Sequence, residues 1–381
     1  MSEQAFIHWT DGDAAGSARW LSESAAAPAS RVVIVDDAIT ADAAYGLACQ
    51  GTALLWRGDF QNARQILAAM GKRLERRMPR PKTMGAGAFH LYRQARAQRA
   101  RTLGALLVEL DERYSMALRR APDVQQACTE VYGPADGASV MSLRTLLGLI
   151  GAHEWRRKGI EVPAIGGRIH PHYGVFAPIR GEYLDLVASA PLPPVSSELG
   201  VAFDIGTGTG VLAAVLAGRG FSQVIATDLD PRALACAREN IARLGLDTRV
   251  HIQQQDLFPP AVAALVVCNP PWIPARPSSS LERGIYDPDS RMLHGFLSAL
   301  PHHLAPGGEG WLILSDLAEH LGLRSRAQLL EAFDKAGLRV IAQHERRPSH
   351  VRASDLNDPL HSARAAEVTS LWRLGVDLRS V

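Results

Sequence analysis

The chain has 381 residues, which excludes a single small domain and fits two domains, or one domain with a large appendage. Hydrophobic residues make up 47% and charged residues 21% of the chain, ordinary values for a soluble globular protein that can bury a core. The formal net charge of +2 is too small to indicate any class of partner.

The four cysteines stand far apart and form no CxxC pair, so neither a zinc knuckle nor a disulfide scaffold is indicated, and we expect no metal. The start of the chain lacks the basic and apolar regions of a secretion signal. The longest apolar stretches, such as Ala261–Cys268, are far shorter than the roughly 18 residues that a membrane span needs. These features predict a reduced, cytoplasmic protein with no membrane partner.

Residues 1–158 are expected to form a mainly helical domain that recognises the substrate. The first 30 residues are weakly patterned, with a short helix around residues 18–21 at most, and residues 31–35 are a candidate strand. From residue 41 to about 121 the pattern is helical, and residues 59–77 place apolar side chains at helix spacing behind Asp59, a plausible N-cap. Further helices are expected at residues 87–120 and 138–157.

This domain contains a basic segment, because 15 Lys and Arg residues between Arg57 and Arg120 stand against five Asp and Glu residues. A charged run is usually a solvated helix face, but here we expect the helices within residues 57–120 to contact a polyanion or an acidic protein. Few aromatic residues are interleaved, so stacking on single-stranded nucleic acid is not supported. The cluster consists of Lys72, Arg73, Arg76, Arg77, Arg80, Lys82, Arg93, Arg96, Arg99 and Arg101.

Residues 159–177 predict a β-hairpin that links the two domains. Two β-like runs flank Gly166 and Gly167, and such a pair is typical of a tight turn. His170 and His172 lie on this hairpin without further ligands nearby in the sequence, which favours a hairpin surface over a metal site.

Residues 178–381 alternate between continuous apolar runs and amphipathic segments, which predicts an α/β fold with a doubly wound, mostly parallel, Rossmann-like sheet. The expected strands are residues 201–204, 223–228, 250–254, 265–269, 311–315, 339–344 and 367–374. The expected helices begin at residue 210 and span residues 231–244, 290–304 and 325–335.

A glycine-rich loop follows the first of these strands. The strand ends in Asp204, and Gly206, Thr207, Gly208 and Gly210 lead into a helix. Glycines at this place let the backbone approach a ligand at the helix N-terminus. The GxGxG spacing differs from the GxGxxG of NAD and FAD proteins, and no Lys-Ser/Thr pair follows, which excludes a P-loop.

The next two strands also end in acidic residues. Asp228, followed by Leu229, lies 22 residues after Gly206, where a carboxylate can bind both ribose hydroxyls of a nucleoside. Asp256 can accept a hydrogen bond from an adenine amino group while Leu257 packs on the ring. Glycines and acids end strands in any α/β protein, but three such ends in register favour a cofactor site.

The fourth strand ends in a motif that can orient a nitrogen atom. The segment is Asn269, Pro270, Pro271 and Trp272. The prolines fix the backbone and lack donors, so the Asn269 side-chain oxygen and the Pro270 carbonyl can each accept one hydrogen of an NH2 group. Trp272 offers a flat wall for a planar amide or base. Methyl transfer to such a nitrogen needs mainly positioning and no charged base, although a rigid turn after a buried strand would look similar.

These segments resemble the class I S-adenosylmethionine-dependent methyltransferases with an NPPY-type motif, in particular the HemK/PrmC group of protein-glutamine N5-methyltransferases with a methyltransferase small domain. The resemblance covers roughly residues 160–375 and includes a lead-in before the glycine loop and the sequence around Tyr286. It implies a sheet with an antiparallel last strand and S-adenosyl-L-methionine as the cofactor. The implied cofactor-binding residues are Asp204, Gly206, Thr207, Gly208, Gly210, Asp228, Leu229, Asp256, Leu257 and Asn269. The implied catalytic residues are Asn269, Pro270, Pro271 and Trp272, and the implied substrate-binding residues are Phe176, Pro178, Arg180 and Tyr286.

The chain also departs from that group. Trp272 replaces the commoner tyrosine, the lead-in around Arg180 differs, the N-terminal part is much larger, and the loop Pro348–Ala366 is long. Tyr286 and Asp287 can either edge the acceptor pocket or cap the following helix.

The expected function is N-methylation of a planar amide or amino nitrogen of a macromolecule, first of all a protein glutamine in a translation-related target. One alternative is a methyltransferase for amino groups of RNA or DNA bases, adenine or guanine, which the basic segment favours. Another is a non-catalytic, RNA-binding protein that keeps the fold, against which the intact Asn269–Trp272 loop argues.

Overall fold

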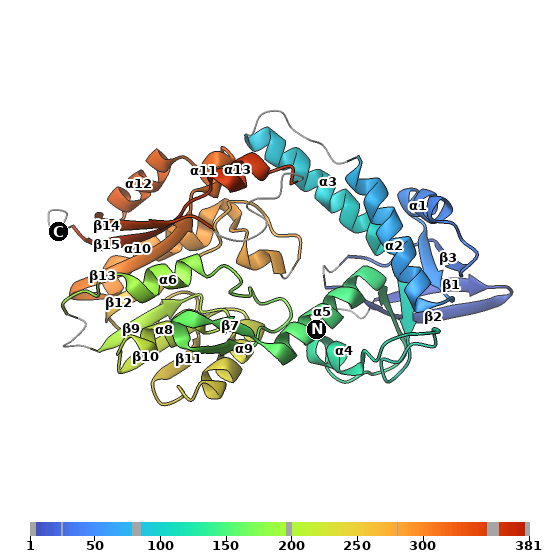
Figure 1. The fold of residues 1–381 in the computed structure, drawn as a ribbon, viewed down its shortest axis with the longest axis horizontal. Helices are drawn as coiled ribbons and strands as arrows, with labels where there is room; N and C mark the ends of the chain where they lie inside the picture. The colour runs from blue at the N-terminus through green and yellow to red at the C-terminus, as the bar shows by residue number, and fades with distance from the viewer. Residues whose placement is uncertain are drawn as a thin grey trace. The chain divides into compact units, whose positions relative to one another are not determined.

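The computed structural model describes residues 5–23, 26–77, 85–195, 200–279, 281–348 and 358–377. Two cations of the basic cluster, Arg80 and Lys82, and residues 349–357 of the long loop lie outside these ranges. The chain forms two compact units (Figure 1), an N-terminal unit of residues 1–80 and 90–154 and a C-terminal unit of residues 81–89 and 155–381. Among the described residues, no helix is both long and apolar enough to cross a bilayer.

The N-terminal unit is built on a six-stranded sheet with the strand order β1-β2-β6-β5-β4-β3. Strands β3, β4 and β5 are parallel, and β6 is antiparallel to β5. The strands are β1 (Phe6–Asp11), β2 (Ala14–Leu21), β3 (Val32–Val35), β4 (Ala53–Trp56), β5 (Leu106–Leu110) and β6 (Ser139–Ser142). The helices are α1 (Ala41–Cys49), α2 (Phe60–Glu75), α3 (Ala86–Gly104), α4 (Gln125–Tyr132) and α5 (Leu143–Lys158), with α3 and α5 crossing the unit boundaries.

This sheet corrects the expectation of a mainly helical first domain. Residues 53–56, 106–110 and 139–142, all assigned to helices from the sequence, are strands, and residues 14–21 form β2 instead of a short helix. The physical reason is burial, since every residue of β4 and β6 is buried, and a short run that is buried on both faces has no period that separates strand from helix. The N-cap prediction is confirmed, because the Asp59 carboxylate accepts a hydrogen bond from the Gln61 backbone N–H at 2.8 Å.

Ion pairs lie at the carboxyl ends of the parallel strands β3 and β4. Asp37, after β3, accepts hydrogen bonds from the Asp59 backbone N–H at 3.0 Å and from the Asn62 side chain at 2.9 Å, and it pairs with Arg119. Asp59, after β4, is bound by both Nε and Nη2 of Arg120 at 2.7 and 2.9 Å. This strand edge therefore satisfies its charges internally.

The C-terminal unit contains a seven-stranded sheet with the order β11-β10-β9-β12-β13-β15-β14, in which β15 alone runs opposite to the other strands. This order confirms the predicted doubly wound α/β fold. The strands are β9 (Val201–Ile205), β10 (Gln223–Asp228), β11 (Val250–Gln254), β12 (Ala263–Cys268), β13 (Leu304–Ser315), β14 (Leu338–Arg346) and β15 (Thr369–Val376). The main helices are α6 (Glu182–Ser189), α8 (Val211–Gly218), α9 (Pro231–Arg243), α10 (Arg291–His303) and α12 (Arg326–Lys335), and the short ones are α11 (Leu317–His320) and α13 (His361–Ala366).

Helices cover both faces of this sheet (Figure 1), and an apolar core lies on each face. Helices α6, α8 and α9 contribute to one core, and α10 and α12 contribute to the other. Strand β12 is buried along its whole length and contributes residues to both cores, alternately from Leu265 to Cys268, which explains its uninterrupted apolar sequence.

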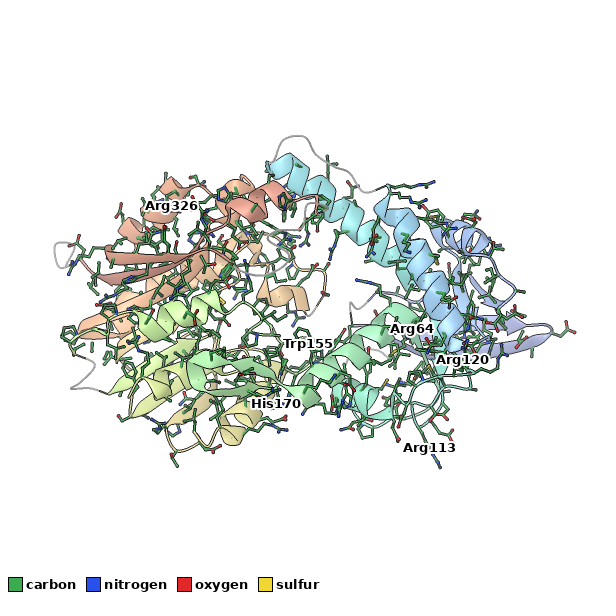
Figure 2. The ribbon with its side chains drawn as sticks, viewed as in Figure 1. Arg64, Arg113, Arg120, Trp155, His170 and Arg326 are labelled. Atoms are coloured by element: carbon green, nitrogen blue, oxygen red, sulfur yellow. The ribbon has the colours of Figure 1, made fainter. Side chains whose placement is uncertain are left out.

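The predicted hairpin is present as β7 (Ile160–Val162) and β8 (Gly167–Ile169). The ring Nδ1 of His170, labelled in Figure 2, lies 2.6 Å from the Arg156 carbonyl, and His172 Nε2 lies 2.7 Å from the Glu239 carboxylate. Both imidazoles therefore tie the hairpin to neighbouring helices. Within the described ranges, no three His, Cys, Asp or Glu side chains come close enough to hold a metal.

Candidate active site

The glycine loop between β9 and α8 has an open side. Gly206, Gly208 and Gly210 have φ values of 74°, 55° and 82°, which side chains rarely adopt. A Cβ on Gly206 would lie 2.5 Å from Met292 Cε, whereas a Cβ on Gly208 would meet no atom within 4 Å. The backbone at Gly208 therefore faces space that a ligand can enter.

Asp204 lies fully buried beneath this loop. Its Oδ2 accepts hydrogen bonds from the Thr207 hydroxyl at 2.6 Å and from the Ala213 backbone N–H at 3.0 Å. Its Oδ1 is buried and has no hydrogen-bond partner in the described part of the chain. Burial raises the pKa of Asp204 to about 7. An unsatisfied buried oxygen at a strand end is a position where a ligand donor fits.

The raised pKa of Asp204 makes the stability of the ligand-free protein depend on pH. Between the usual value of 3.8 and about 7, the folded state holds a proton that the unfolded state has lost. We therefore expect this contribution to stability to be complete below about pH 4 and to be lost as the pH rises through 7, a change on the order of 1–4 kcal/mol. Chemical denaturation at a series of pH values should show a flatter profile for Asp204→Asn, and an identical profile would contradict this assignment.

Asp228, at the end of β10, joins the same site. Its Oδ2 accepts a hydrogen bond from the Gly208 N–H at 3.0 Å, and its Oδ1 accepts one from the Asp230 N–H at 2.9 Å. Burial raises its pKa. The adjacent Leu229 is 60% exposed, an unusual state for a large apolar side chain that a ligand could cover.

The residues after β11 are less enclosed than those after β9 and β10. Asp256 is exposed, and its nearest cation is Arg291 at 3.9 Å. Leu257 has a φ of 72°, rare for a branched side chain, and its carbonyl accepts a hydrogen bond from the Thr227 hydroxyl at 2.5 Å. The structure thus brings the ends of β9, β10 and β11 to one edge, with Asp204 and Asp228 more enclosed than Asp256.

The Asn269–Trp272 loop follows β12, which pairs with β9 on the side opposite β10. The indole Nε1 of Trp272 donates a hydrogen bond to Asn269 Oδ1 at 2.8 Å. A carbonyl oxygen has two lone pairs, so this bond orients the Asn269 amide and leaves one lone pair for another donor. Ile273 pairs with the segment around Tyr286, which holds the end of the loop.

Arg180 lies over the Trp272 ring, with its guanidinium carbon 5.0 Å from the ring centroid. It also forms ion pairs of 3.0 Å with the buried carboxylates of Glu182 and Glu367. Glu367 in turn accepts a hydrogen bond from the Ser315 hydroxyl at 2.6 Å. The indole face under Arg180 is therefore not open for stacking, and the substrate contact expected of Arg180 stays a prediction.

Phe176 of the lead-in lies against the turn at Leu281–Gly284, which precedes Tyr286. A Cβ on Gly284 would lie 2.8 Å from Phe176 Cβ, so Phe176 packs closely against this turn, and Pro178 is buried. Asp287 accepts hydrogen bonds from the backbone N–H groups of Met292 and Leu293 at 3.0 and 3.1 Å. Of the two roles left open for Asp287, the structure shows the capping of α10.

Three charged residues of this site were not among the residues predicted for it. Glu182 and Glu367 hold Arg180, and the buried Arg324 lies 3.5 Å from the Trp272 carbonyl oxygen. Glu182 stands within the lead-in segment and could have been found there, whereas Glu367 and Arg324 follow no motif.

Residues 167–346 match the sequence model of the methyltransferase small domain. This part of the chain is a class I methyltransferase domain. It is of the S-adenosylmethionine-dependent, HemK-like type that the motifs predicted.

Three relatives illustrate the range of proteins similar to the methyltransferase domain. The release factor glutamine methyltransferase of Cereibacter sphaeroides is 34% identical over 188 residues, which are 46% of this chain and 65% of the relative. The ribosomal protein uL3 glutamine methyltransferase of Bordetella pertussis is 37% identical over 115 residues, 28% of this chain and 38% of the relative. The tRNA1(Val) (adenine(37)-N6)-methyltransferase of Aeromonas salmonicida is 39% identical over 121 residues, 29% of this chain and 50% of the relative. The chain thus spans less than two thirds of each relative.

Proposed function

We propose that the whole chain is an enzyme that transfers a methyl group from S-adenosylmethionine to a planar amide or amino nitrogen of a macromolecule. The observation that carries this proposal is the placement of Asn269, Pro270 and Pro271 after β12, directly beside the glycine loop that follows β9. A loop with two fixed acceptors next to a cofactor site is the arrangement that positions an NH2 group for in-line transfer.

The residues at the edge of the sheet fit this cofactor. The buried Asp204 Oδ1 has no hydrogen-bond partner among the described residues and can accept a hydrogen bond from an ammonium or water donor, and the backbone at Gly208 leaves room for the ligand. Asp228 is positioned to accept hydrogen bonds from ribose hydroxyls, and the exposed Leu229 offers an apolar surface to a purine ring. S-adenosylmethionine, when bound, supplies an electrophilic methyl group.

The acceptor loop would then orient the nitrogen. The free lone pair of Asn269 Oδ1 and the Pro270 carbonyl each take one hydrogen of the NH2 group, so that the nitrogen lone pair is directed away from them. The Trp272 indole holds the Asn269 amide in place, and Arg180 and its two carboxylates hold the indole. These residues position the acceptor, and positioning is the main contribution needed for an in-line displacement.

As the acceptor we propose first a protein glutamine in a translation-related target, with the N-terminal unit recognising that target. Similarity to two glutamine methyltransferases, one named for a release factor and one for a ribosomal protein, supports this choice. Such a target would place the enzyme in the cytoplasm.

The second candidate is the amino group of an RNA adenine, which similarity to a tRNA adenine methyltransferase and the basic helices favour. Incubation of the enzyme with methyl-labelled cofactor and cell extract, followed by protease or nuclease treatment, separates the two candidates. Label that survives nuclease and is lost with protease supports glutamine, and the reverse supports the base. Mass spectrometry of the labelled fragment then identifies the methylated atom.

Asp228→Ala tests the proposed cofactor site. We expect cofactor affinity to fall at least tenfold, because each charge-assisted hydrogen bond to a ribose hydroxyl contributes about 1.5–3 kcal/mol. Isothermal titration measures the dissociation constant, and Asp256→Ala is the matched control, with a smaller loss expected at the more exposed carboxylate. An unchanged dissociation constant for Asp228→Ala would contradict the assignment of the end of β10 to the cofactor site.

A further inference from the structure

The N-terminal unit has a basic groove of about 540 Å³ between α1 and α2, which pack against each other (Figure 1). We call it the α1–α2 groove. It is lined by Asp42, Tyr45, Ala69, Lys72, Arg73, Arg76 and Arg77. Four cations and one carboxylate face it, so the groove carries a formal charge of about +3 in a chain whose total is +2.

Residues of α1 and α2 hold two of these cations in place. Arg73 Nε donates to the Asp42 carboxylate at 2.7 Å, and its Nη1 donates to the Ala69 carbonyl at 3.1 Å. Arg77 Nη1 donates to the Tyr45 hydroxyl at 2.9 Å, and the guanidinium lies 5.4 Å from the tyrosine ring centroid. Each guanidinium has five N–H donors, so both arginines keep donors for an anion while losing little conformational freedom on binding it.

The other two cations, Lys72 and Arg76, are exposed and have no ion-pair or hydrogen-bond partner within the described ranges. Lys72 lies in the last turn of α2 and Arg76 is its C-cap residue in helical conformation, so the two stand four residues, or about 6 Å of helix rise, apart. Arg73 and Arg77 repeat this spacing one residue later, with Arg77 in the turn that follows α2. The groove therefore presents two parallel rows of positive charge, which one linear polyanion can contact along its length.

The tyrosines of this region do not offer stacking platforms. Arg77 covers Tyr45, and Arg96 on α3 lies 5.9 Å from the ring centroid of Tyr92. A ligand can thus be recognised through its charges and not by stacking of bases, which favours the phosphate backbone of a structured nucleic acid over an unpaired strand.

The competing explanation for the cations at the end of α2 is that they stabilise the helix through its dipole. Cations in the last turn stabilise a helix through its partly negative C-terminus, and Lys72 and Arg73 lie in the last turn of α2. Stabilisation of the helix requires neither two rows of cations nor a groove beside them. It predicts that neutralising these cations lowers helix stability and leaves ligand binding unchanged.

We infer that the α1–α2 groove binds the phosphate backbone of structured RNA. The inference deepens the proposed function and rests on it, because it names RNA as part of the macromolecule on which the acceptor is presented. The dense, regular charge of a nucleic acid backbone matches two rows of cations better than the sparser carboxylates of an acidic protein do.

The test uses the full-length protein and a labelled RNA duplex of about 20 base pairs in fluorescence anisotropy at several salt concentrations. The variant is Lys72→Gln/Arg76→Gln, which removes the two cations without structural partners. The matched control is Arg64→Gln/Arg113→Gln, which removes two exposed cations of the same unit outside the groove (Figure 2). Thermal unfolding confirms that the variants are folded, and titration with S-adenosylmethionine tests the other unit separately.

We expect the groove variant to lose about tenfold or more in RNA affinity near 0.1 M salt and to lower the slope of log K against log salt by about 2. The control should change affinity less than twofold, and cofactor binding should be unchanged in both. A DNA duplex bound equally well supports backbone recognition. RNA binding that is unaffected by the groove variant, or groove-dependent binding of poly-glutamate in preference to RNA, overturns the inference. If the wild-type protein did not bind S-adenosylmethionine, the proposed methyltransferase function would be rejected. The RNA-binding measurement would still show whether the groove binds RNA.

Discussion

Asn269→Ala is expected to lower turnover by roughly 10²–10³ at saturating cofactor, the scale observed when one positioned polar group is lost from an active site. The substitution removes one of the two acceptors for the NH2 group and leaves Pro270, Pro271 and the glycine loop in place. Cofactor affinity should therefore stay close to the wild-type value. Steady-state kinetics on the acceptor, combined with isothermal titration of the cofactor, separate the two effects.

Trp272→Phe is the matched control for that experiment. It removes the indole N–H that holds Asn269 Oδ1 at 2.8 Å but keeps an aromatic ring at the same position. We expect a smaller fall in turnover than for Asn269→Ala, because the amide oxygen is still present and is only less well oriented. If Asn269→Ala retained near wild-type turnover, the loop would be a structural turn and the N-methyltransferase proposal would have to be abandoned.

Deletion of residues 1–154 is expected to abolish methylation of the macromolecule while cofactor affinity is largely retained. The proposed cofactor and acceptor residues lie in the C-terminal unit, whereas the basic α1–α2 groove lies in the N-terminal unit. The cut is placed before Trp155, since Arg156 forms an ion pair of 2.6 Å with Glu239 of α9 and belongs with the methyltransferase domain. Transfer of labelled methyl groups to the natural acceptor and titration of the cofactor are the two measurements.

The deletion also removes residues 81–89, which cluster with the C-terminal unit. Thermal unfolding is therefore the control that shows whether the truncated protein is still folded. A truncated protein that unfolds cooperatively, binds the cofactor and fails to methylate supports a division of labour between the units. Full activity of a folded truncated protein on its natural acceptor would refute that division.

The fold of the C-terminal unit could be predicted because its strands differ sharply from its helices. Residues 223–228 and 250–254 were predicted with the bounds that β10 and β11 have, since each is a β-rich run that flanks the amphipathic helix α9. β13 begins seven residues earlier than predicted, at Leu304, because its first residues, including Gly307 and Gly308, read as a turn in the sequence.

The N-terminal unit could not be predicted in the same way. β1 alternates buried Ile7 and Trp9 with exposed neighbours, and Gly12, with a φ of 58°, lies between it and β2. This period of two and its turn glycine were the available signals, but they span only a few residues. β4, in contrast, is buried on both faces, and no local pattern separates such a run from a helix.

Within the site, motifs located the residues at the strand ends but not the contacts that support them. Asp204, Asp228 and Asn269 follow strands, and the order of strands in a sheet brings such ends to one edge. The ion pair of Arg180 with Glu367 joins residues from distant parts of the chain through the antiparallel placement of β15. Such a pairing is a property of tertiary structure, and a single sequence contains no local signal for it.

The ion pairs at the ends of β3 and β4 affect how many cofactor molecules one chain is expected to bind. Parallel strands in α/β units commonly bind ligands at their carboxyl ends, and this chain has parallel strands in both units. In the N-terminal unit, Arg119 and Arg120 occupy the Asp37 and Asp59 carboxylates, so a nucleoside would have to displace charged pairs to enter there. The expected molar ratio in a cofactor titration is therefore one per chain, although the polypeptide contains two α/β sheets.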